Sequence, residues 1–234
     1  MKFKIDQSVA NLFPSIKVGI LIAEGIENST TDTDISLLLD EEQENCKSQF
    51  ISEQISSIPK IRDWREAYRK FGFKPSSYRS SIEALIRRVL KGKNLPSINP
   101  IVDLYNLISI KYLIPIGADD LDKIEGIINL TIAEGNETFL KLGSDVPETA
   151  QKGEVIYRDD KEVLCRCWNY RECEKSKITE ATKNVCLVFE GLESTAKEEI
   201  LKSISDLKEL ISKYCRGGFK EYYLDKSTLE AISK

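Results

Sequence analysis

Histidine is absent from the 234-residue chain, and its absence excludes the commonest nucleophilic enzymes. Ser-His-Asp and Cys-His catalysis both need an imidazole to take a proton from the nucleophile. A zinc site would instead need a cysteine-rich or carboxylate set, and no C-x-x-C spacing occurs. We therefore predict neither a metal site nor a cofactor. We expect reduced, mostly buried thiols, as in a cytosolic protein. The six cysteines are Cys46, Cys165, Cys167, Cys173, Cys186 and Cys215.

Long apolar runs are lacking as well. No stretch reaches the roughly 20 residues that cross a bilayer, and the N-terminal M-K-F-K-I-D-Q-S lacks the apolar core of a signal peptide. We expect a cytoplasmic protein with no membrane partner. A chain of 234 residues can form one substantial core, and no repeat or linker divides it, so we predict a single domain over residues 1–234.

Positive charge is concentrated in one segment, although the formal net charge is −4. Between Lys60 and Lys93, eleven basic residues oppose only three acidic ones, which gives this segment +8 and the rest of the chain −12. Basic groups contact phosphates and aromatic faces stack on unpaired bases, so the segment predicts a surface for an RNA end. The candidate contacts are Arg65, Arg69, Lys74, Arg79, Arg87 and Arg88.

The aromatic residues of the same segment have a second interpretation. Trp64, Tyr68 and Phe71 are spaced i, i+4, i+7, as in the apolar stripe of a helix whose arginines form the solvated back. Both interpretations stay open from the residue pattern alone.

Helix signals dominate the first half of the chain. Ser80 and Glu83 have capping-box spacing, and Asn99 followed by Pro100 is an N-cap and first-turn pair. The pattern predicts a strand at 16–23 and helices at 36–58, 63–70, 80–91 and 101–112, the last with an apolar stripe of Val102, Tyr105, Ile108 and Tyr112.

Strand signals dominate from residue 113 onward. Asp119, Asp120 and Asp122 indicate an acidic turn, and Asp159-Asp160 indicates a hairpin turn. The spacing predicts strands at 126–133, 154–157, 162–168, 184–189 and 219–224, and a helix at 196–214 opened by Thr195 and Glu198. Cys165 and Cys167 should then face the same side of a strand.

The predicted helices precede most of the predicted strands along the chain, and this order favours an α+β fold. We predict N-terminal helices packed on a mostly antiparallel sheet, together with a long C-terminal helix.

Three short sequence motifs follow one another between residues 95 and 126: V-D-L-Y-N (102–106), P-I-G-A-D-D (115–120) and D-K-I (122–124). This stretch resembles the B3/B4 domain of the bacterial phenylalanyl-tRNA synthetase beta subunit, with its pattern V-D-x-x-N, G-Q-P-x-H-A-F-D and D-K-I. Further phrases resemble free-standing B3/B4-domain proteins and extend the match to about 61–214. These are W-R-E-A-Y-R-K-F-G (64–72), K-P-S-S-Y-R-S-S-I-E-A-L (74–85) and W-N-Y-R-E (168–172).

The resemblance implies hydrolysis of the ester on a mischarged tRNA. Gly117 stands where the family has its pocket histidine, and Pro96 where it has an arginine. The family's glutamate position is Val188, and Glu190 lies two residues later on the same strand face. We expect Glu190, or Asn169 with Arg171, to orient the water. The substrate pocket implied by the resemblance contains Asp103, Asn106, Pro115, Gly117, Trp168, Glu172 and Thr182.

The first hypothesis is therefore a trans-acting editing factor whose partner is the acceptor end of tRNA, in association with a synthetase or the translation machinery; no DNA partner is expected. One alternative is a non-catalytic module that binds tRNA or an amino acid on the same scaffold. Another is a partner-binding protein that uses the helix at 196–214. For Asp103 and Asn106, buried hydrogen bonds that fix their helix are an equally good explanation.

Overall fold

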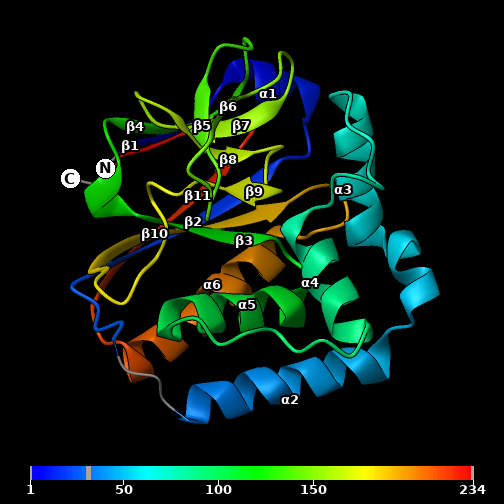
Figure 1. Cartoon of the computed structure of the whole chain (residues 1–234), viewed down its shortest axis with the longest axis vertical. Helices are drawn as coiled ribbons and strands as arrows, with labels where there is room; N and C mark the ends of the chain where they lie inside the picture. The colour runs from blue at the N-terminus through cyan, green and yellow to red at the C-terminus, as the bar shows by residue number, and fades with distance from the viewer. Residues whose placement is uncertain (1, 30–32, 233–234) are drawn as a thin grey trace.

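The strands of the computed structural model, which describes residues 2–29 and 33–232, form three sheets (Figure 1). A four-stranded sheet has the order β11-β2-β10-β3 and is antiparallel throughout. Its strands are β2 (Lys17–Glu24), β3 (Ile116–Asp120), β10 (Asn184–Gly191) and β11 (Gly218–Asp225).

A six-stranded sheet has the order β12-β1-β4-β7-β8-β9, and its only parallel pair among the described strands is β1 with β4. Its strands are β1 (Lys2–Ile5), β4 (Ile127–Ile132), β7 (Val155–Arg158), β8 (Val163–Arg166), β9 (Arg171–Glu172) and β12 (Glu230–Ile232). A small hairpin of β5 (Thr138–Leu140) and β6 (Pro147–Thr149) forms the third sheet.

The helices lie mainly on the far side of the four-stranded sheet from the six-stranded one (Figure 1). The α-helices are α1 (Gln7–Leu12), α2 (Thr33–Gln49), α3 (Pro59–Lys70), α4 (Ser81–Leu90), α5 (Pro100–Tyr112) and α6 (Lys197–Tyr214). Two 3-10 helices are η1 (Ser52–Ser57) and η2 (Leu121–Lys123).

The four-stranded sheet is the middle layer of the molecule, with α2, α5 and α6 below it in Figure 1 and the six-stranded sheet above it. Strands β2 and β10 are buried along nearly their whole length because both of their faces are covered. The α+β class and the long C-terminal helix are confirmed, but the strands form two main sheets rather than one.

Local signals set several element boundaries as expected. Asn99 caps α5 by accepting a hydrogen bond from Val102 N at 3.1 Å, and Ser80 caps α4 by accepting one from Glu83 N at 3.4 Å. The cap of α6 differs: the Glu199 carboxylate accepts from Ala196 N at 2.9 Å, so the helix begins one residue later than the Thr195 and Glu198 pair predicted.

Three other expectations were wrong. The helix predicted to end at residue 58 ends at Gln49, because the chain is extended at Ile51 before η1. Helix α3 begins four residues early, with Pro59 in its first turn. Asp119 lies within β3 rather than in a turn, although Asp120, at the end of β3, caps η2 as expected by accepting from Asp122 N at 3.1 Å.

On α5 the buried face is Ile101, Leu104 and Ile108, while Tyr105 is only half-buried, so most of the predicted apolar stripe is displaced. The strands β1 and β12 and the helix α1 had no sequence prediction, since each is short. Among the described residues, no helix is both long and apolar enough to span a membrane.

Gly19 of β2 lies where the strand packs closely against α6, so a substitution there tests this packing. A Cβ atom at Gly19 would lie 2.6 Å from both Ile200 Cγ2 and Ile204 Cδ1. We expect Gly19→Ala to lower the free energy of unfolding by about 1–3 kcal/mol in urea titrations, as overpacking does. Gly218→Ala is the matched control because a Cβ there would meet nothing within 4 Å. Equal stability of the two variants would contradict this packing.

Candidate active site

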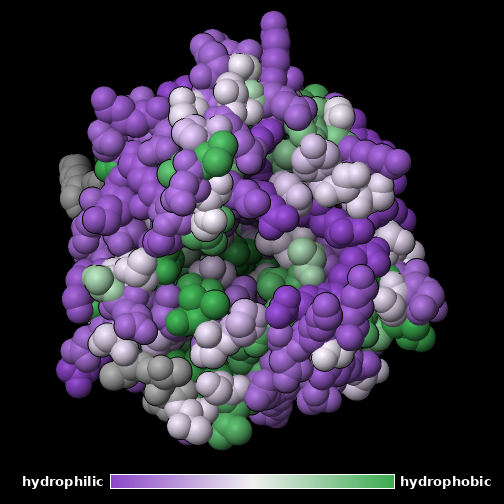
Figure 2. Space-filling view, viewed as in Figure 1, coloured by the Kyte–Doolittle hydropathy of each residue, from purple (hydrophilic) through white to green (hydrophobic). Residues whose placement is uncertain are grey.

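A small cavity lies where β3, β9, β10 and the start of α4 meet. Its volume is about 20 Å³, enough for about one water molecule. Figure 2 shows a hollow with an apolar floor on this face of the molecule, over the same elements. The cavity is lined by Ser81, Gly117, Ala118, Asp119, Tyr157, Cys165, Trp168, Asn169, Glu172, Val188 and Glu190.

Glu190 is the central carboxyl group of this cavity. It comes from β10, is 3% exposed, and accepts hydrogen bonds from Tyr157 Oη and Asn169 Nδ2, both at 2.7 Å. Burial raises the pKa of Glu190 to about 7, and the hydrogen bonds from Tyr157 and Asn169 only partly oppose this rise. A carboxyl group with this pKa can exchange a proton near neutral pH.

The hydrogen bonds of Glu190 continue into the helical layer. Tyr68 Oη of α3 donates to Asn169 Oδ1 at 2.9 Å, and Ser81 N of α4 donates to the Asn169 carbonyl at 3.0 Å. Asn169 is thus held at both its side chain and its backbone. The carboxyl group of Glu190 is therefore held by Tyr157 of β7 and by Asn169 of the β8–β9 turn, and Asn169 is itself held by the Tyr68 side chain of α3 and the backbone of α4.

Two further carboxyl groups face the cavity, and both have perturbed pKa values. Burial raises the pKa of Asp119 to about 6, against a hydrogen bond from Ser176 Oγ. Burial, followed by the charges of Asp119 and Glu190, raises the pKa of Glu172 well above its ordinary value. A Cβ atom at Gly117 would lie 3.1 Å from Glu172 Oε1, so the Glu172 carboxyl group occupies the space beside this glycine.

The turn between β8 and β9 brings Trp168 and Asn169 to the cavity by an unusual backbone path. Cys167 and Trp168 both have left-handed conformations, with φ of 46° and 65°. Each costs about 1–2 kcal/mol for a residue with a Cβ atom. Trp168 N donates to the Val155 carbonyl at 2.6 Å, and Cys167 N donates to Glu154 Oε1 at 2.7 Å. These bonds hold the turn in its strained form.

This turn overturns one expectation from the sequence. Cys165 lines the cavity with Glu190, but Cys167 faces a different pocket because its backbone leaves the strand conformation. All six cysteines are free and buried.

Trp168 carries a buried polar atom that is left unsatisfied. The residue is 0% exposed, and its Nε1–H has no hydrogen-bond partner among the described residues. The indole nonetheless lies close enough to Glu190 to lower the pKa of that carboxyl group. An orphaned donor beside an ionisable carboxyl group, at a cavity the size of a water molecule, suits a small oxygen ligand.

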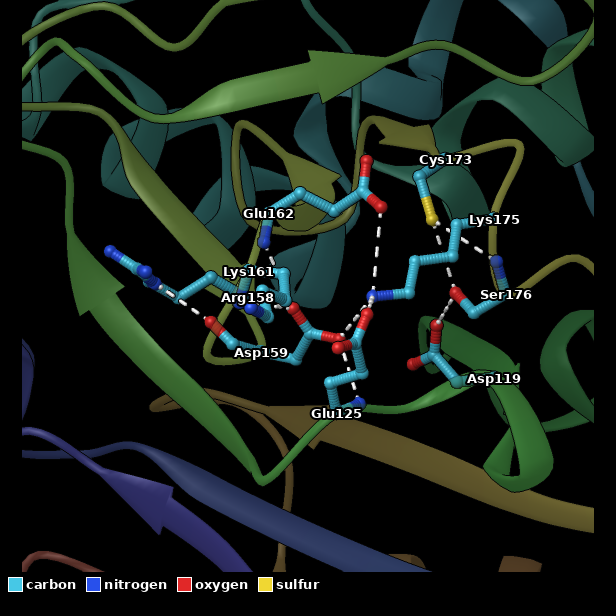
Figure 3. A network of polar contacts seen from close by, with 9 residues as sticks. All are labelled: Asp119, Glu125, Arg158, Asp159, Lys161, Glu162, Cys173, Lys175 and Ser176. Atoms are coloured by element: carbon cyan, nitrogen blue, oxygen red, sulfur yellow. Dashed lines mark hydrogen bonds and ion pairs between the residues drawn. The ribbon is translucent and has the colours of Figure 1, made fainter.

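A second polar network supports the loop behind Asp119 (Figure 3). Lys175 Nζ reaches Asp159 Oδ2 at 2.7 Å, Glu125 Oε1 at 3.0 Å and Glu162 Oε1 at 3.6 Å. Burial alone would raise the pKa of Asp159, but hydrogen bonds from Lys175 and three backbone N–H groups hold it below its ordinary value. The network ties the segment after β9 to the β7–β8 hairpin, and Ser176 at its edge contacts Asp119.

Several predicted pocket residues lie away from the cavity. Asp103 accepts hydrogen bonds from Ile98 N and Ser97 Oγ and so fixes the start of α5, and Thr182 donates to Asp120 at 2.8 Å. Pro115 contributes only its carbonyl, which accepts from Glu190 N at 3.0 Å. Asn106 is half-buried on α5, and Arg171 is exposed, with its guanidinium over the Tyr170 ring. Of the predicted residues, the cavity brings together Gly117, Trp168, Asn169, Glu172 and Glu190.

The predicted RNA-binding residues divide into two groups. Arg65 and Arg87 each bond Glu83 Oε1 at 2.8 Å, with Arg79 Nε 3.9 Å from the same atom, and Glu83 is 0% exposed. Arg65 therefore links α3 to α4, whereas Arg87 pairs with Glu83 within α4 and Arg79 approaches it from the segment just before α4. The others, Arg69, Lys74 and Arg88, have exposed side chains.

The aromatic residues of the basic segment are mainly core residues. Trp64, Tyr68, Phe71 and Phe73 are all at most 8% exposed, so base stacking by these four is excluded in this conformation. The apolar-stripe interpretation is the correct one for Trp64, Tyr68 and Phe71. Tyr78 is half-buried and contacts Tyr170, with ring centroids 5.2 Å apart.

Sequence reasoning missed Asp119, Tyr157 and Tyr68. Asp119 lies two residues after Gly117 on a strand, so period-two alternation could have placed it on the cavity side. Tyr157 and Tyr68 carry no such signal, because a buried tyrosine in a strand or on an apolar helix face looks like any core residue.

The raised pKa of Glu190 predicts how stability changes with pH. The folded protein holds a proton on Glu190 up to about pH 7, whereas the unfolded chain releases it near 4.5, so this group makes stability fall as pH rises through that range. The full effect is about 3 kcal/mol. We expect Glu190→Gln to flatten the fall measured by urea unfolding between pH 5 and 8. Glu53→Gln, at an exposed position, is the control. If the free energy of unfolding falls equally steeply with pH in the two variants, Glu190 does not have the raised pKa.

The chain is similar in sequence to phenylalanine–tRNA ligase beta subunits. The chain is 27% identical over 166 residues to the phenylalanine–tRNA ligase beta subunit of Fusobacterium nucleatum, covering 71% of this chain and 18% of that protein. It is 32% identical over 98 residues to the same subunit of Idiomarina loihiensis, covering 42% and 12%. The chain thus spans less than a fifth of the length of these relatives.

Among solved structures, an N-terminal fragment of the Pyrococcus horikoshii phenylalanyl-tRNA synthetase beta subunit matches with a TM-score of 0.47 at 16% identity, over 94% of this chain and 49% of that one. The family model of the B3/4 domain matches residues 63–218, which include every residue of the cavity. The protein belongs to the B3/4 domain family.

Proposed function

We propose that this protein hydrolyses the ester that joins a wrong amino acid to the 3′ end of a tRNA, acting in trans. The observation that carries the proposal is Glu190, a buried carboxyl group with a pKa of about 7 at a cavity the size of one water molecule. Support also comes from the B3/4 family and from the similarity to phenylalanine–tRNA ligase beta subunits.

In the proposed reaction, a water molecule in the cavity attacks the ester carbonyl carbon while Glu190 takes its proton. The tetrahedral intermediate then breaks the bond to the ribose oxygen, and Glu190 returns the proton to that oxygen. Asn169 and Tyr157 hold Glu190 in place, and the unpaired Trp168 Nε1–H donates to the oxyanion. This scheme needs no histidine.

The binding partner in this proposal is the acceptor end of the tRNA. The exposed side chains of Arg69, Lys74 and Arg88 contact phosphates, while Arg65, Arg79 and Arg87 mainly hold Glu83 and so shape that surface. A cytosolic location and association with a synthetase belong to the same proposal, and six free buried thiols suit a reducing compartment.

Hydrolysis is tested by incubating the protein with a panel of mischarged tRNAs and following the loss of each aminoacyl ester. We expect one or a few esters to be cleaved, at a rate that rises as Glu190 ionises near pH 7. Glu190→Gln should lower the rate by about 10²–10⁴-fold, whereas the exposed Glu53→Gln should not. Tight tRNA binding without cleavage of any ester would favour a non-catalytic binding module instead.

RNA binding is tested separately by charge reversal at exposed positions. The double variant Arg69→Glu, Lys74→Glu is expected to weaken tRNA affinity and to flatten its dependence on salt, since each lost phosphate contact lowers the slope by about 0.7–0.9. Lys226→Gln, in the exposed turn between β11 and β12, is the control. Unchanged affinity in the double variant would refute the assigned surface. Arg65 and Arg87 are unsuitable because their reversal would leave Glu83 buried without its cations.

A further inference from the structure

A second pocket lies on the opposite side of the strained turn from the Glu190 cavity. Its volume is about 320 Å³, within the range of small-molecule sites. Residues 167–172 line both sites: Trp168, Asn169 and Glu172 line the cavity, whereas Cys167, Tyr170 and Arg171 line the second pocket. The two sites therefore share one wall.

The second pocket combines aromatic rings with cations. Tyr78 and Tyr170 meet edge to face with ring centroids 5.2 Å apart, and the Arg171 guanidinium lies 4.6 Å from the Tyr170 ring centre. Tyrosine rings and the guanidinium plane of arginine are surfaces on which unpaired bases stack. Both tyrosines are half-buried, so each keeps part of its surface open.

The charge of the pocket is suited to a phosphate. Lys141 and Arg171 are exposed, and neither forms an ion pair with a carboxylate in the described ranges 2–29 and 33–232. Arg166, in contrast, forms ion pairs with Glu154 at 2.9 Å and with Glu148 at 2.8 Å. The only acidic residue that lines the pocket is Glu148, so Lys141 and Arg171 leave an excess of positive charge.

We propose that this pocket binds a nucleotide, with the base stacked on the Tyr170–Arg171 pair and the phosphate held by Arg171 and Lys141. This inference rests on the proposed function in one respect: the nucleotide is assigned as the 3′-terminal adenosine of the RNA. Arg171 is a binding residue in this arrangement, not one that orients water.

The test uses adenosine 5′-monophosphate, adenosine and inorganic phosphate as probes in calorimetric titrations of the full chain. The monophosphate is expected to bind more tightly than either fragment. Tyr170→Ala should weaken its binding about tenfold or more, the scale of one lost stacking contact, and Tyr170→Phe should restore it. Lys141→Gln should weaken binding of the monophosphate but not of adenosine, Arg171→Gln should weaken binding of both, and Lys226→Gln should change neither.

Two outcomes would overturn the inference: monophosphate binding that does not respond to Tyr170→Ala, or inorganic phosphate binding as tightly as the nucleotide. Ester hydrolysis separates this result from the proposed function. If the nucleotide binds as expected and no ester is cleaved, the pocket assignment stands and the hydrolase proposal fails. If esters are cleaved and Tyr170→Ala changes neither nucleotide binding nor the KM for the ester, the pocket assignment alone fails.

Discussion

The site depends most on the hydrogen bonds of Glu154, a carboxylate that is 0% exposed. Its two oxygens accept from Arg166 Nε and Nη2, from Cys167 N and from Gln151 N. A buried carboxylate is tolerated only when charge and hydrogen bonds compensate for its lost hydration, and four donors do so here. In return, Glu154 holds the end of β8 where the chain enters two left-handed residues, Cys167 and Trp168.

The strained turn has a geometric consequence that an ordinary strand could not produce. In a strand, side chains alternate faces with period two, so residues 165 and 167 would share one face. Two left-handed residues break that alternation and rotate Trp168 and Asn169 toward Glu190, while Tyr170 and Arg171 face the other pocket. Backbone strain of this kind persists only where surrounding contacts enforce it, and it clusters at functional sites.

The sequence identified those site residues that local patterns or the family resemblance mark. Gly117, Glu172 and Glu190 could be found this way, and alternation along β3 could have added Asp119. Tyr157 and Tyr68 could not be found, since their role depends on β7 and α3 converging on Glu190 from distant parts of the chain. The side of Cys167 was mispredicted because neither cysteine nor tryptophan signals a positive φ. The fold class was predictable because helix caps and apolar strands are local features, whereas the division into two sheets depends on long-range pairing such as β1 with β4.

Three carboxyl groups in the cavity can accept and donate protons although the chain has no histidine. Asp119, Glu172 and Glu190 line one space with no cation among the described cavity residues, so burial keeps their pKa values high, and the charges of Asp119 and Glu190 add to the rise for Glu172. A carboxyl group near pKa 7 has the proton affinity that an imidazole would supply. Gly117 is part of this arrangement, because a Cβ atom there would lie only 3.1 Å from Glu172 Oε1. A side chain at position 117 would press on the Glu172 carboxyl group, so the packing of the cavity depends on a residue with no side chain as well as on the carboxyl groups themselves.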